Sequence, residues 1–276
     1  MRKILIFLLL PLLFSSCQEE VVLDLDRKES RVPVIEGYWT DQAVYNEVKI
    51  SLSKNYYDSL DLELIRDADV FIKEQSTGRK IAFRYLDASR SYRPNPLERA
   101  RVGETYQLNV TWKGKVFQSE GLMLEPPIVD SVVWNYEEKR LFRDEGYFIR
   151  VYGKIPFSEN NYYRIRVIEN DKLYNQPEDY LLFDDTFGLQ VFEQGLELGY
   201  AFKNNDRIRL ELYRLNKDVF DYLSQLVNLL FNDGGLFSPP PQNPKSNIRV
   251  VKGDSQVLGF FAVSPVLSRT VIIPSN

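Results

Sequence analysis

The sequence predicts a mostly β protein with two β-rich regions and one main α-helix. Three observations lead to this fold class. Short runs that alternate apolar and polar residues recur along the chain, and turn residues separate them. A single longer stretch, 218–232, has its apolar residues at helical spacing. A proline pair, Pro126-Pro127, divides the short runs into two groups, because proline fixes φ and cannot donate to a β-ladder.

The first region, residues 31–124, is expected to be a β-sandwich. Its clearest run is Gly103–Trp112, which resembles a late strand of an immunoglobulin-like or fibronectin-like module, and Lys113-Gly114 marks a hairpin turn directly after it. The strands expected in this region are 32–39, 47–53, 68–73, 80–86, 103–112 and 115–120.

The second region, residues 125–276, is expected to be a β-rich domain, either a sandwich or barrel-like. Between its strands lies a loop-rich segment, Asn170–Asn205, dense in Tyr, Phe and Asp; long loops inside a compact domain are often functional. The strands expected here are 130–136, 147–155, 162–169, 207–214, 256–264 and 270–273, the last two split by Pro265.

The main helix is expected over 218–232. Asn216 stands at the position of its N-cap, and Gly234-Gly235 supplies a left-handed C-cap. The stiff segment Ser238–Pro241 then leaves the helix as polyproline-like chain. That segment fits two interpretations, a rigid partner-docking segment or a connector that packs the helix on the sheet.

The amino terminus predicts secretion and lipid attachment. Arg2 and Lys3 precede an apolar run, Ile4–Phe14, that is too short to span a bilayer, and residues 1–16 therefore read as a signal peptide. The following Cys17 is the only cysteine of the chain, and its setting resembles a bacterial lipobox, in which the thiol is acylated. We expect 17–30 to be a lipidated tether that holds the protein at the outer membrane. The alternative is an ordinary secreted protein whose signal contains a cysteine.

Three residues directly after the cysteine, Gln18, Glu19 and Glu20, resemble the acidic export signal of Bacteroidota lipoproteins that face the cell exterior. The expected location is therefore the outer membrane, anchored by lipid on Cys17 and exposed on the outside of the cell.

Composition excludes several classes of function. The formal net charge of −4 argues against a nucleic-acid partner, which would require concentrated Lys and Arg. The chain has no histidine, so Ser-His-Asp and Cys-His nucleophile systems and imidazole metal sites are excluded. We expect no metal, no cofactor and no enzymatic activity.

Aromatic and proline residues are the candidate contacts with a partner or ligand. The preferred aromatic residues lie in the loop-rich segment. Tyr162-Tyr163 is not preferred, because tyrosine favours strands and this pair is expected to pack within the sheet. The candidate contact residues are Tyr174, Tyr180, Phe183, Phe187, Phe237, Pro239, Pro240 and Pro241.

Other short motifs have weaker support. Asp184-Asp185 and Asn204–Asp206 fit solvated turns better than a carboxylate pair or a calcium site. Ser59 and Ser131 each stand in an Asp-Ser-aliphatic motif that resembles the acceptor for O-linked glycans in Bacteroidota.

Five segments together resemble one family of Bacteroidota lipoproteins, a domain of unknown function numbered 4249. They are Val34–Asp41, Pro126–Ser131, Gly234–Pro241, Ser246–Ile248 and Leu258–Ser264. The resemblance implies a surface lipoprotein that works beside a TonB-dependent outer-membrane barrel, as a lid or accessory subunit, in some cases with other lipoproteins. It implies no catalytic residues, because none are established for the family.

Three functions remain in order of preference. The first is an accessory subunit of an outer-membrane barrel complex, for nutrient uptake or membrane assembly. The second is a stand-alone surface lipoprotein that binds a glycan or peptide through the aromatic loop. The third is an enzyme that uses carboxylates, which would require one carboxyl group with a pKa raised by burial.

Overall fold

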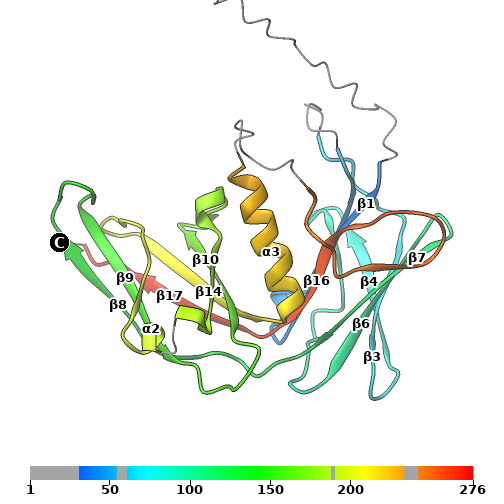
Figure 1. The fold of residues 1–276 in the computed structure, drawn as a ribbon, viewed down its shortest axis with the longest axis horizontal. Helices are drawn as coiled ribbons and strands as arrows, with labels where there is room; N and C mark the ends of the chain where they lie inside the picture. The colour runs from blue at the N-terminus through cyan, green and yellow to red at the C-terminus, as the bar shows by residue number, and fades with distance from the viewer. Residues whose placement is uncertain (1–30, 55–60, 188–189, 233–241, 276) are drawn as a thin grey trace, which may run out of the picture. The chain divides into compact units, whose positions relative to one another are not determined.

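A computed structural model describes residues 31–54, 61–187, 190–232 and 242–275 (Figure 1). The expectation of a mostly β fold with one main helix is confirmed. The strands form three sheets, and the residues from Val32 to Asn276 make one compact unit.

The largest sheet has nine strands in the order β15-β7-β6-β3-β4-β5-β2-β1-β16. Its expected strands are confirmed, and the short β5 and β15 are additions that the alternation of residues did not reveal. The bounds are β1 (Pro33–Thr40), β2 (Glu47–Leu52), β3 (Asp69–Glu74), β4 (Lys80–Leu86), β5 (Ser91–Arg93), β6 (Thr105–Trp112), β7 (Lys115–Leu122), β15 (Arg249–Lys252) and β16 (Leu258–Ser264).

This sheet curls around an apolar interior. Strands β7 and β16 lie near opposite ends of the strand order, yet a Cβ placed on Gly121 of β7 would lie 2.7 Å from the Val263 side chain of β16. Curling brings the apolar face of every strand toward one core, as expected for strands that alternate inward and outward residues. Its largest buried side chains are Trp39, Tyr106, Phe117 and Phe261.

The two smaller sheets come from the second half of the chain. The five-stranded sheet contains β11 (Lys172–Leu173), β10 (Tyr162–Glu169), β14 (Arg207–Leu215) and β17 (Val266–Ile272), and β12 (Leu181–Asp184) also pairs with β10. The three-stranded sheet has the order β13 (Leu196–Glu197), β9 (Gly146–Lys154), β8 (Ile128–Glu137). Short helical turns are η2 (Ala43–Tyr45), η3 (Pro177–Asp179), η4 (Asp185–Phe187) and α2 (Gln190–Glu193).

A division of the chain after Leu124 stays a prediction, but residues beyond 245 contribute two strands to the N-terminal sheet. Strand β16 lies beside β1 and β15 beside β7. After Pro265 the same stretch of chain continues as β17 in the five-stranded sheet (Figure 1). A fragment that stopped at Leu124 would therefore lack both edge strands of this sheet, β15 and β16.

The expected helix is α3 (Lys217–Leu230). It buries Val219, Tyr222 and Leu223 in a cluster with residues of β14 and β16. Asn216 is the N-cap residue as predicted, but its side chain does not cap the helix. Instead its amide donates to the backbone oxygens of Leu122 and Val263, both at 3.0 Å, and so ties the helix start to β7 and β16. The glycines predicted as the C-cap lie outside the described residues.

Helix α3 is the longest helix of the described residues, at 14 residues. No helix in this part of the chain is both long enough and apolar enough to cross a membrane.

The parallel pairing of β1 with β16 allows a direct test. Gly259 pairs with Ile35 and has φ of +98°, and a Cβ there would lie 2.0 Å from the Ile35 carbonyl oxygen. We expect Gly259→Ala to lower the free energy of unfolding by about 3 kcal/mol or more, measured by urea denaturation, because it adds a clash to backbone strain.

The matched control is Gly78→Ala. Gly78 also has a positive φ, +71°, but no atom lies within 4 Å of a Cβ placed there. Backbone strain alone should cost roughly 1–2 kcal/mol. Equal decreases in the free energy of unfolding of Gly259→Ala and Gly78→Ala would contradict the close approach of β16 to β1.

Candidate interaction surface

Strands β8 and β17 each leave one edge unpaired among the described residues. β8 pairs with β9 alone, and β17 pairs with β14 alone. Between these two edges lies a groove of about 320 Å³, bordered by Val129–Val132 and Trp134 of β8 and by Arg269–Ile272 of β17. Four consecutive residues of each strand thus run along the same opening.

A β-bulge decides which side chains of β8 face the core. The register shifts between Val129 and Ser131, so one extra residue enters the strand there. Beyond the bulge Val132 lies opposite Val151, Trp134 opposite Ile149, and Tyr136 opposite Tyr147. Directly opposed residues share a face of the sheet. Because all three partners on β9 are buried, Val132, Trp134 and Tyr136 belong to the core-facing side of β8.

This core-facing side is nevertheless uncovered toward its end. Trp134 is 37% exposed and Tyr136 53% exposed, although Ile149, opposite Trp134, is 0% exposed. Tyr136 has an edge-on contact with Tyr147, with ring centroids 5.2 Å apart. Tyr136 thus packs against β9, and no described strand pairs with the free edge of β8.

More exposed apolar side chains lie along β8, in the connection after it and at the end of β17. Leu141 and Phe142, in the connection between β8 and β9, are 87% and 95% exposed. We call the whole set the apolar edge; it consists of Ile128, Val133, Trp134, Tyr136, Leu141, Phe142 and Ile272. Large exposed apolar side chains that gather in one place mark interaction sites on soluble surfaces. The alternation of residues predicted the strand here but not the exposed surface. The signal for that surface was the apolar pair Leu141-Phe142 between charged residues.

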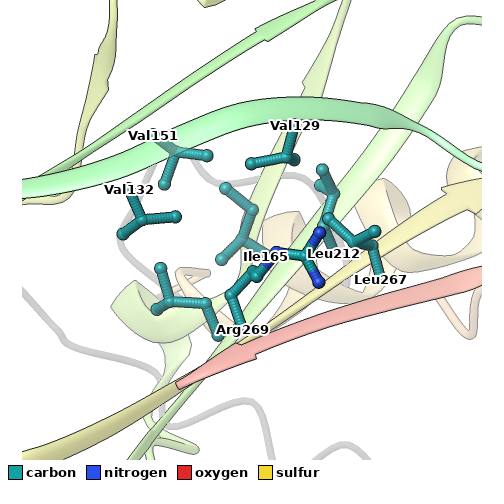
Figure 2. Close-up of a pocket in the computed structure, with 8 residues that line it drawn as sticks. Val129, Val132, Val151, Ile165, Leu212, Leu267 and Arg269 are labelled. Atoms are coloured by element: carbon teal, nitrogen blue, oxygen red, sulfur yellow. The ribbon is translucent and has the colours of Figure 1, made fainter. Parts of the chain in front are cut away.

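Arg269 lies on the core-facing side of β17. It is opposite Leu210, and its neighbour on the same face, Leu267, is opposite Leu212. Figure 2 shows the Arg269 side chain among Val129, Leu212 and Leu267, extending from β17 toward β8. Its Nη1 donates to the Ser268 backbone oxygen at 3.3 Å, and no carboxylate of the described residues lies within salt-bridge distance of it.

Two of the aromatic residues predicted as contacts, Tyr174 and Phe183, pack against the core. Tyr174 donates from Oη to Glu169 Oε2 at 2.9 Å and meets Tyr200 edge-on, and both rings pack against the core of the five-stranded sheet. Phe183 stacks on the buried Tyr163 with centroids 5.1 Å apart. Their role as partner contacts stays a prediction, and the packing gives both residues a structural role.

Among the predicted aromatic contacts with a described side chain, Tyr180 is the one that does not belong to a core cluster. It is half-buried, and the guanidinium of Arg164 lies 4.8 Å from its ring centroid. The side chain of Phe187 is outside the described part of the structure. Also outside it are Cys17, Gln18, Glu19, Glu20, Ser59, Phe237, Pro239, Pro240 and Pro241. Ser131 is exposed on β8, beside the bulge, and borders the groove.

The carboxylates that could support catalysis are held in turns or ion pairs. Asp184 accepts the Thr186 amide at 3.0 Å, and Asp185 accepts the Asn161 side chain at 3.0 Å. Both are therefore engaged in local turn structure. Within the described ranges no three Asp, Glu or Cys side chains come together as a metal-binding group.

Asp206 closes another turn. Burial acts to raise its pKa, but hydrogen bonds from Asn170 and from the Lys203 amide outweigh burial and lower the pKa. The neighbouring Glu169 has a pKa raised by burial and by the adjacent Asp206. Glu169 is the last residue of β10, and Asp206 directly precedes β14. The hydrogen bond from Asn170 to Asp206 connects the ends of these two strands.

The buried carboxylate Glu211, 2% exposed, is neutralised by its neighbours. It lies directly opposite Arg166 across β10 and β14, with Arg166 Nη1 3.3 Å from Glu211 Oε2. Arg209 binds the other oxygen at 3.2 Å, and Tyr213 donates to Oε2 at 3.1 Å. Both oxygens are occupied, which fits a stabilising role for this group, since a buried charge requires partners.

The fold and the apolar edge thus define a mostly β protein with a large uncovered sheet border. A family model described as a domain of unknown function (DUF4249) matches residues 18–270, and the chain belongs to this family. Comparison with curated proteins finds no match.

The packing of the aromatic loop predicts that truncating Phe183 and truncating Tyr180 lower the free energy of unfolding by different amounts. We expect Phe183→Ala to lower the free energy of unfolding by about 2–3 kcal/mol, because it removes a ring that packs on Tyr163 and the core. Tyr180→Ala should cost less than about 1 kcal/mol, since it loses one cation–π contact. Urea denaturation of both variants measures the difference. If Tyr180→Ala lowered the free energy of unfolding more than Phe183→Ala, the loop would not pack on the core through Phe183.

Proposed function

We propose that this protein is a surface-exposed outer-membrane lipoprotein that serves as an accessory subunit of a barrel complex. It binds its partner, a TonB-dependent-receptor-like barrel, through the apolar edge. The supporting observation is the uncovered core-facing side of β8 with Trp134 and Tyr136, next to the exposed Leu141 and Phe142.

Energetics supports a macromolecular partner for this surface. Burying one large apolar side chain fully contributes about 1.5–3 kcal/mol. Trp and Tyr are the residue types that most often dominate protein interfaces. Several such side chains around one sheet border therefore suit a stable contact with another protein.

The stand-alone alternative, a glycan or peptide gripped by the aromatic loop, has less support. It requires accessible rings at Tyr174 and Phe183, and both pack against the core. We propose no catalytic role.

Lipid attachment is tested at Cys17. The mature wild-type chain should carry acyl chains at its amino terminus and fractionate with the outer membrane, because several chains make attachment effectively permanent. Cys17→Ser should be released in soluble form and lack the lipid mass. Intact mass spectrometry and membrane fractionation measure both. A wild-type protein that is free of lipid would refute the anchor.

Partner binding is tested at the apolar edge. Purified in mild detergent from the cells that make it, the lipidated wild type should retain a stoichiometric barrel. The variant Leu141→Ser/Phe142→Ser should lose most of that barrel while keeping its fold, because these two side chains are 87% and 95% exposed.

The matched control is Val44→Ser/Leu97→Ser, which removes exposed apolar side chains of the N-terminal half. This control should retain the barrel. If the apolar-edge variant retained as much barrel as the control, the apolar edge would not be the binding surface.

A further inference from the structure

We infer that the groove between β8 and β17 accepts one extended segment of the partner protein as an added β-strand, whose acidic side chain pairs with Arg269. This inference rests on the proposed function, because it specifies how the partner is held. It concerns the groove, whereas the proposed function concerns the apolar edge as a whole.

The backbone of both borders is available for pairing. Neither β8 nor β17 has a partner on its groove side among the described residues. Neither strand contains proline, so each residue whose amide points away from the paired neighbour, about every second one, can donate into the groove. One inserted strand would provide hydrogen-bond partners for two open edges at once, which is the mode known as β-strand addition.

The side chains along the groove suit a strand better than a helix or a compact domain. Beside the groove lies a narrow apolar gap that shares Val129, Val132 and Arg269 with it. We call the aliphatic lining of that gap the floor, and it includes Val151, Ile165 and Leu210. Val132 and Leu267 lie on the same core-facing side at the two borders. A strand points alternate side chains to one face, so an inserted segment would place every second residue on this floor. The next floor-facing residue of the segment, in the direction of Trp134, would cover the exposed indole.

Arg269 determines the chemistry of the segment. Its guanidinium extends toward the floor of the groove and has no carboxylate partner among the described residues. Covering the groove with an apolar strand would bury this charge, and an unpaired buried charge is strongly unfavourable. An Asp or Glu at a floor-facing position of the segment would neutralise it and fix the register.

The same residue explains why the open edge is selective. Inward-pointing charges and bulges are devices that keep exposed edges from pairing with unsuitable strands. Arg269 and the bulge before Val132 stand on opposite borders of the groove. A segment without a carboxylate, or a basic one, would be rejected by charge.

Photo-crosslinking in the intact complex tests the inference and requires no candidate sequence for the partner segment. A photoreactive phenylalanine analogue replaces Val133 on β8, Ile272 on β17, or Phe142 in the hairpin, one at a time. Mass spectrometry then identifies the attached partner peptide. Positions 133 and 272, on the two strands that border the groove, should label the same short segment of the partner, and that segment should contain an Asp or Glu.

Charge reversal provides the second measurement. Arg269→Glu should reduce crosslinking from position 133 at least tenfold, and Arg269→Lys should retain most of it. Replacing the acidic residue of the labelled segment by Lys should restore crosslinking to Arg269→Glu. Arg269 is exposed, so these variants should fold, which circular dichroism verifies.

The outcomes separate the two proposals. Labelling from position 142 but not from 133 or 272 would overturn strand insertion and leave the barrel partnership intact. Different partner segments at 133 and 272, or attachment to another copy of this chain, would also overturn it. If no barrel co-purified at all, the proposed function itself would fail.

Discussion

The parallel pairing of β1 with β16 is the contact on which the rest of the structure depends. It joins Val34–Thr40, near the start of the described chain, to Leu258–Ser264, near its end. The backbones approach so closely at Gly259 that only hydrogen fits opposite the Ile35 carbonyl oxygen. Because the chain runs on through Pro265 into β17, this pairing also determines where the five-stranded sheet begins.

The open groove follows from that arrangement. Strand β17 enters its sheet as the last strand, beside β14, and β8 enters the three-stranded sheet as the last strand, beside β9. The two sheets share one apolar core but are not joined by a ladder between β8 and β17. The described part of the chain therefore has two unpaired edges that face the same apolar floor. Trp134 borders the same groove as Arg269, whose guanidinium no described carboxylate neutralises.

Buried polar groups in this protein stabilise junctions. Arg214 is 4% exposed and donates to the backbone oxygens of Glu125, Glu159 and Asn160 at 2.8–3.2 Å, with its guanidinium 3.5 Å from the Phe157 ring centroid. Burial lowers its pKa, and three carbonyl partners compensate for the loss of water. Arg214 thereby connects β14 to the chain just before the proline pair that precedes β8.

Local patterning in the sequence determined most strand positions and helix α3, because periods of two and 3.6 residues are properties of short segments. Its motifs indicated the family, which the family model confirms, and they predict a signal segment at residues 1–16. It did not reveal that Tyr174 and Phe183 pack inward, that Asn216 binds Leu122 and Val263, or that Trp134 lies uncovered. Only the tertiary structure decided these, because whether a side chain is covered depends on strands far away along the chain.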